Sequence, residues 1–95
     1  MDVEAGNDLA RKGTLGSTVQ SILAELKPEA AYFMAENGRR GGILIVDISD
    51  ASQIPAIAEP WFLAAKAKVE FIPAMRPEDL AKAGPSSEAA VKKYG

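Results

Sequence analysis

Residues 31–50 have the sequence AYFMAENGRRGGILIVDISD, which consists of an apolar run, a glycine-rich turn and a second apolar run. Asn37 and Gly38 form a favoured turn pair, because both tolerate the positive φ that a type I′ turn requires. Side chains alternate along a strand, so Tyr32 and Met34 share one face of the first run. The stretch therefore predicts a β-hairpin.

The second arm of this hairpin, residues 43–48, is apolar on both faces apart from Asp47. Such a pattern is typical of a strand that is covered on both sides. We therefore expect this strand to lie centrally in its sheet, with a neighbour on each edge.

Helical patterns flank the hairpin. Apolar residues recur at helical spacing over residues 15–26, and Pro28 disfavours helical geometry at the residue before it, so the first helix should end there. A second apolar stripe covers residues 54–65. Pro60 lies inside this stripe without a backbone donor, which predicts a kink or a break just before Trp61.

Residues 69–75 alternate in the manner of a strand, but Pro73 cannot donate to a ladder, which favours an edge strand. Arg76 then precedes a proline and two acidic residues, a pattern typical of a helix start. We expect a single α+β domain over residues 1–95, in which residues 76–95 form a C-terminal helical extension.

Composition excludes several classes of protein. The chain has 95 residues, of which 47% are hydrophobic and 25% are charged, and no apolar run approaches the ~20 residues of a membrane-spanning helix. The net charge of −2 provides no field that would gather phosphates, so we expect no nucleic-acid partner. Without cysteine there are no disulfides or thiolate metal sites, and the first residues lack the apolar core of a secretory signal. We expect a cytoplasmic protein that binds no membrane.

The predicted order of elements is that of a βαββαβ arrangement whose first strand is nearly absent. The segments EAGN, LKPEAAYF, GGILIVDISD, IPAIAEPWF, VEFIPAMRPEDL and AKAGP resemble a small, functionally uncharacterised bacterial family of the dimeric α+β-barrel superfamily. The resemblance covers nearly the whole chain. It implies a ferredoxin-like protomer with an antiparallel sheet, and two such protomers that pack sheet against sheet around a barrel. We therefore expect a homodimer or a higher homo-oligomer.

The chain departs from this resemblance in two respects. The resemblance implies several apolar residues ahead of Met1 as the body of the first strand, whereas only residues 1–5 stand there. We expect either that Met1 is an internal methionine taken as a start, or that the strand is truncated or supplied by another chain. The histidines that serve haem or acid–base roles in some members of the superfamily have no counterpart here, so no catalytic residue can be assigned.

Aromatic residues are the best candidates for a ligand site. Tyr32, Trp61, Phe62 and Phe71 could line a cleft between the second long helix and the sheet, with the Tyr32 hydroxyl and the Trp61 N–H as polar groups. Core packing explains most of them equally well. Asp47 joins the set, because a carboxylate within an apolar strand is costly unless it is paired or exposed.

Other polar clusters have plainer explanations. Residues 13–18 could bind an anion ahead of a helix, but they lack the lysine of a phosphate-binding loop, and a helix cap explains them better. Arg39 and Arg40 are best interpreted as solvated turn charges, and Asp50 as a helix cap. We predict neither a metal site nor a cofactor.

Two classes of function agree with these observations. The first is a homodimer with a structural role or a small apolar ligand, favoured by the lack of catalytic groups. The second, which the resemblance permits, is a cofactor-independent oxygenase or isomerase that acts on a small apolar substrate inside the barrel.

Overall fold

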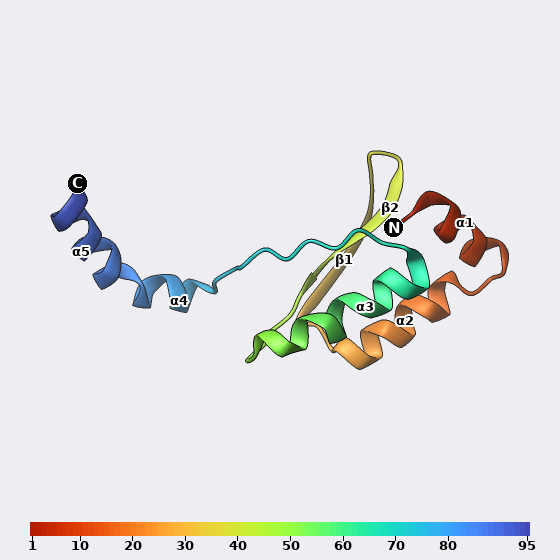
Figure 1. Ribbon diagram of the computed structural model, residues 1–95, viewed down its shortest axis with the longest axis horizontal. Coiled ribbons are helices and arrows are strands. Elements are labelled where there is room, and N and C mark those ends of the chain that lie inside the picture. Colours follow the sequence, from red (N-terminus) through yellow and green to blue (C-terminus); the bar gives the residue numbers. More distant parts are fainter.

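The computed structural model describes residues 1–95 as a mixed α+β chain with a two-stranded antiparallel sheet (Figure 1). This confirms the α+β class. None of its helices has the length and apolar character needed to cross a bilayer. In chain order the elements are α1 (Val3–Arg11), α2 (Leu15–Leu26), β1 (Ala30–Glu36), β2 (Arg39–Ile45), the 3₁₀ helix η1 (Ala51–Gln53), α3 (Ile54–Ala65), α4 (Pro77–Lys82) and α5 (Gly84–Tyr94).

The hairpin predicted within residues 31–50 is confirmed, but its second strand is shifted: β2 begins at Arg39 and ends at Ile45, so Asp47 follows the strand and does not lie within it as predicted. Asn37 and Gly38 have φ values of 52° and 74°, as a type I′ turn requires, and Glu36 pairs with Arg39 on either side of them. β2 therefore begins directly after the two-residue turn.

β2 lies at the edge of this sheet, because β1 is its only strand neighbour. The central position expected for it is not realised within a single chain. Residues 67–75 are extended but belong to no ladder, so the strand predicted at 69–75 is absent. Pro73 has no N–H to donate, and an alternating pattern becomes a strand only where an adjoining strand offers backbone partners.

The helices begin and end close to their predicted positions. α2 ends at Leu26, and Lys27 takes a left-handed conformation with φ 47° before Pro28. The prediction at Pro60 was a kink or a break; α3 is continuous through Pro60, so the break is wrong, and the kink stays a prediction. A proline has a helix-compatible φ and removes one helical hydrogen bond, and the bonds on either side of Pro60 suffice to continue the helix.

The core is small and consists mainly of small residues. α1 contacts both α2 and α3, and these two longer helices lie side by side (Figure 1). The chain buries four of its 95 residues, namely Gly6, Ile22, Ala58 and Ala65. Small residues let helices approach closely, but they leave most of the large apolar side chains of this chain on its surface.

The C-terminal arm, defined here as residues 67–95, extends away from the rest of the molecule (Figure 1). α4 and α5 in this arm contact each other and no other element. The molecule measures 59 × 28 × 20 Å and has a radius of gyration of 17.7 Å. A compact domain of this length has a radius of gyration of about 12 Å. A single chain therefore leaves much of its apolar surface uncovered.

Candidate functional site

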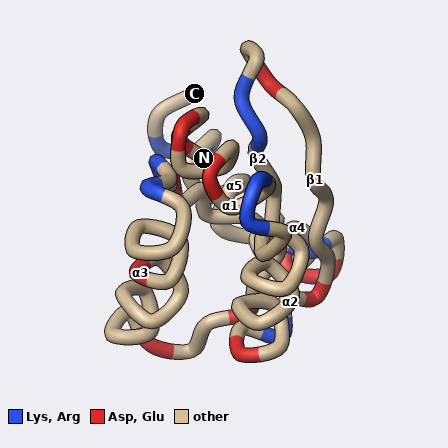
Figure 2. The backbone as a smooth tube through the Cα atoms, turned by 90° about the vertical axis from the view of Figure 1, so that its right-hand side faces the viewer, with Lys and Arg blue, Asp and Glu red and all other residues tan.

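One face of the hairpin presents an exposed apolar surface, which we call the sheet face. It consists of Tyr32 and Met34 from β1 and Ile43 and Ile45 from β2. Tyr32 and Ile43 are directly opposite each other and are 64% and 56% exposed. The charged residues of the two strands gather at the turn end of the hairpin (Figure 2). The sheet face is therefore an uncharged apolar patch on a surface that water reaches.

The opposite face of the hairpin is turned towards the rest of the chain. Ala31 and Leu44, which are paired on this face, are half-buried. The ring of Phe33 lies over Gly42, where an added Cβ would come within 2.9 Å of the ring. Phe33 is nevertheless 52% exposed, so this face is only partly covered, and the sheet face carries the larger number of exposed apolar side chains.

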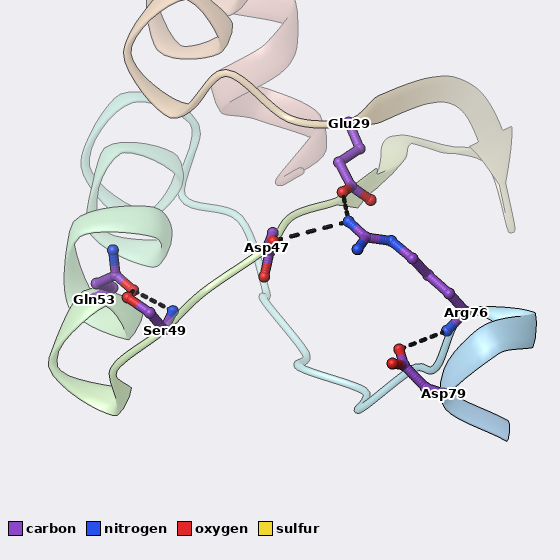
Figure 3. A network of polar contacts seen from close by, with 6 residues as sticks. All are labelled: Glu29, Asp47, Ser49, Gln53, Arg76 and Asp79. Carbon is purple, nitrogen blue, oxygen red and sulfur yellow. Dashed lines mark hydrogen bonds and ion pairs between the residues drawn. The ribbon is translucent and has the colours of Figure 1, made fainter. Parts of the chain in front are cut away.

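A polar network connects the C-terminal arm to the base of the hairpin (Figure 3). The Arg76 guanidinium donates a hydrogen bond to Glu29, which precedes β1, and lies 3.8 Å from the carboxylate of Asp47, which follows β2. The backbone N–H of Arg76 donates to Asp79 Oδ2 at 3.2 Å, which fixes the start of α4. Arg76 therefore joins three segments of the chain.

The carboxylates of this network stabilise the charged form of the guanidinium. The hydrogen bond to Glu29, followed by the negative charges of Glu29 and Asp47, raises the pKa of Arg76 above its ordinary value. Both carboxylates remain partly exposed. The network therefore works as a surface tether, in which solvent screens much of the attraction.

A capping arrangement follows β2 and starts the next helix. The Asp50 carboxylate accepts a hydrogen bond from the Ser52 N–H at 3.0 Å. The Gln53 Oε1 in turn accepts from the Ser49 N–H at 2.8 Å (Figure 3). It also accepts from the Asp50 N–H at 3.1 Å. Asp50 is therefore a cap, as predicted, and its carboxylate is engaged in structure.

The N-terminus is fixed between β2 and α3. The Met1 amine donates to the carbonyl of Arg40 at 2.9 Å, and the Asp2 N–H donates to the carbonyl of Ala65 at 3.3 Å. The Arg40 side chain in turn donates to Asn7 Oδ1 at 2.9 Å. Residues 1 and 2 therefore occupy the space between the start of β2 and the end of α3.

The five predicted ligand-site residues lie on four different segments. Tyr32 belongs to the sheet face, and Asp47 is exposed beside Arg76. On α3, Trp61 is half-buried and Phe62 is 42% exposed, while Phe71 lies in the C-terminal arm. None of the five lines the groove of about 600 Å³ between α2 and α3. Their role in ligand binding stays a prediction.

Sequence reasoning missed the most connected polar residue of the molecule. The sequence around Arg76 indicates only the residue before a helix, because nothing in its neighbourhood marks a contact with Glu29 and Asp47 far back in the chain. The one available signal for this network is Asp47, a carboxylate that follows a run of apolar residues. No group of three or more acidic side chains gathers in a way that would hold a metal ion.

Comparisons with protein-family models, with curated proteins and with solved structures gave no match.

Proposed function

We propose that this chain is a ferredoxin-like α+β protomer that works as a homodimer, with a structural role or a small apolar ligand between its sheets. The observation that carries the proposal is the exposed sheet face, Tyr32, Met34, Ile43 and Ile45. Removing apolar side chains from water is the main driving force of association, and a contiguous apolar patch marks an interaction surface.

The surface area of the chain supports a dimer. A single chain exposes 7437 Å². A compact monomer of this mass exposes about 5,200 Å², which leaves an excess of about 2,200 Å². Obligate homodimers commonly bury about 1,000 to 2,500 Å² on each subunit. The excess is of the size that one such interface removes.

The chain direction supports a ferredoxin-like protomer. Ala65 at the end of α3 lies near the start of β2 through the contacts of Met1 and Asp2, and Arg76 lies near its end through Asp47. Residues 67–75 therefore run in the same direction as β2 after the crossover through α3. This is the relation between the last two strands of a βαββαβ unit.

The sheet face also suits a small apolar ligand. Two such faces packed against each other leave aliphatic walls with the Tyr32 hydroxyl as a polar group, a combination typical of small-molecule sites. Tyr32 is the one polar group among the four side chains of the sheet face.

Sedimentation equilibrium of the purified chain tests the dimer. We expect the mass of two chains at micromolar concentration, and the mass of one chain for Ile43→Lys, because a buried lysine without a partner opposes association. Leu63→Lys is the matched control. Leu63 is 80% exposed on α3, away from the sheet face, and this variant should remain dimeric. A monomeric parent chain, or a dimeric Ile43→Lys variant, contradicts the proposal.

Native mass spectrometry of the same preparation tests the ligand. A small molecule retained by the dimer and lost in Ile43→Lys supports a ligand between the sheets. A dimer without any retained molecule favours the structural role.

A further inference from the structure

The tip of the hairpin places an asparagine directly before a glycine. The chain has two asparagines, Asn7 and Asn37. Asn7 lies in α1 and its Oδ1 accepts from Arg40 at 2.9 Å, whereas Asn37 is exposed and its side chain makes no hydrogen bond. The N–H of Gly38 donates to no carbonyl, and an added Cβ at Gly38 would meet no atom within 4 Å. The Asn37 side chain and the Gly38 nitrogen are therefore unengaged and open to water.

The chemistry open to such a pair is cyclisation with loss of ammonia. Hydroxide removes the proton of the Gly38 nitrogen, which attacks Cγ of Asn37. The bond from Cγ to the side-chain nitrogen then breaks, and ammonia leaves with a proton from water, which restores the hydroxide. Glycine has no Cβ to hinder the approach of its nitrogen. The product is a five-membered imide between the two residues.

Water opens this imide in one of two ways, adding OH to a carbonyl carbon and returning H to the Gly38 nitrogen. Opening at Cγ leaves aspartate. Opening at the main-chain carbonyl of Asn37 leaves isoaspartate, in which the backbone runs through the former side chain and the main-chain carbonyl becomes a free carboxylate. Both routes consume water and release ammonia, and neither needs another reactant.

The folded turn holds the two reacting atoms apart. The φ values of 52° and 74° place Asn37 and Gly38 in a type I′ turn, whose first central residue has a ψ of about 30°. In an L-residue this ψ directs the next nitrogen away from Cβ, whereas ring closure needs both on the same side of the Cα–C bond. Rotation about that bond separates Glu36 from Arg39, which pair across the turn. The reaction therefore proceeds from an open turn, and its rate follows the population of that state.

Isoaspartate at this position would change the hairpin permanently. It adds one backbone carbon to a turn of two residues, and the type and length of the turn set the register of the strands. It also places a new carboxylate beside Arg39 and Arg40 at the exposed tip. The modified tip therefore differs from the parent turn in both shape and charge.

We propose that Asn37 is a site of spontaneous deamidation, controlled by opening of the hairpin turn, and that its isoaspartate product is a substrate for an enzyme that methylates isoaspartyl carboxylates. The exposed tip presents this carboxylate where an enzyme can reach it. The site is separate from the sheet face, because it uses the turn and no side chain of either strand.

Incubation of the full chain at mildly alkaline pH in ¹⁸O-labelled water tests the site. Peptide mapping by mass spectrometry should show replacement of the Asn37 amide by an ¹⁸O-containing carboxylate. The rate should exceed that of Asn7 by a factor of about ten or more, which corresponds to about 1.4 kcal/mol in activation free energy. Asn7 is the internal control, because the nitrogen that would attack it belongs to Asp8, which has a Cβ and lies within α1. A purified isoaspartyl methyltransferase with a radiolabelled methyl donor should label the incubated chain and leave fresh chain unlabelled.

Two further comparisons test the control by the turn. Conversion of Asn37 should be faster in guanidinium chloride than in the folded chain by a factor of about ten or more, because the denaturant removes the turn. Asn37→Asp keeps a residue that type I′ turns favour but has no amide to lose, so it should accept far less methyl label after the same incubation.

Three results would overturn the proposal. The first is conversion of Asn37 in the folded chain that is no faster than that of Asn7, which includes conversion only in denaturant. The second is equal conversion in the folded and the denatured chain. The third is an incubated chain that accepts no methyl label.

Discussion

The part of the chain before residue 67 and the C-terminal arm differ in what their apolar side chains contact. The first part contains all four buried residues, which belong to α1, α2 and α3. The arm contains none, although Ile72, Leu80 and Val91 are 82%, 62% and 68% exposed. The two regions show that apolar content does not by itself build a core, because burial needs a second surface.

The two regions also differ in the contacts that hold them in place. Backbone hydrogen bonds and packed helices hold the first part together, whereas the side-chain hydrogen bonds and ion pairs between the arm and the first part involve only Arg76. Regions with few apolar contacts and exposed backbone open at low free energy. We therefore expect the first part to govern global stability and the arm to move independently of it.

Replacing Ile22 by alanine should have the largest effect on stability. Ile22 is 6% exposed and is the one large side chain in the core, so its truncation leaves a cavity among the helices. We expect a loss of about 2 to 5 kcal/mol in the free energy of unfolding, measured by urea denaturation. The matched change in the arm, Leu80→Ala, should alter it by less than about 0.5 kcal/mol. Comparable losses from the two substitutions would show that the arm is packed in solution.

Replacing Asp50 by alanine should have an intermediate effect. The substitution removes the acceptor for the Ser52 N–H, and cap losses of this kind cost about 1 kcal/mol. Asp50→Asn keeps an oxygen acceptor without the charge, so its urea midpoint should stay near that of the parent chain. If the asparagine variant were as unstable as the alanine variant, the charge of Asp50, and not its capping bond, would be the stabilising feature.

The elements that local sequence determines were predicted well. Asn37 and Gly38 require a particular turn, and Pro28 ends the helix before it, because both effects act through backbone conformation at neighbouring residues. The sequence suggests aromatic residues as a ligand site, but it does not indicate where these residues lie in the folded chain. Tyr32 and Trp61 fit a pocket or a core equally well in sequence, and burial depends on segments that meet only in space.

The errors have a common physical origin. The strand expected at residues 69–75 has a suitable pattern, but a ladder requires a backbone partner that the pattern cannot supply. The expectation of a break at Pro60 gave too much weight to one missing hydrogen bond, because the other bonds of α3 continue the helix. Arg76 could not be recognised as a tether, since the pairing with Glu29 joins residues that are 47 positions apart.

Replacing Arg76 by glutamine should have the smallest effect on global stability and the clearest effect on the arm. Without the guanidinium, neither Glu29 nor Asp47 retains its contact with the start of α4. We expect backbone ¹⁵N relaxation to report greater mobility for α4 and α5, with no change in α2 or α3. Arg39→Gln, which removes the same charge at the hairpin turn, is the control and should leave the arm as it was.

The pH and salt dependence of the arm distinguishes this tether from apolar packing. A group whose pKa is raised by folding contributes fully below its unfolded value and loses that contribution only as pH rises through the folded value. Since the pKa of Arg76 is raised from an already high value, the tether should hold unchanged from neutral to moderately alkaline pH. Added salt should loosen it, because the paired charges are exposed. Arm mobility that is insensitive to both salt and Arg76→Gln would mean that apolar contacts, made with another copy of the chain, hold the arm in solution.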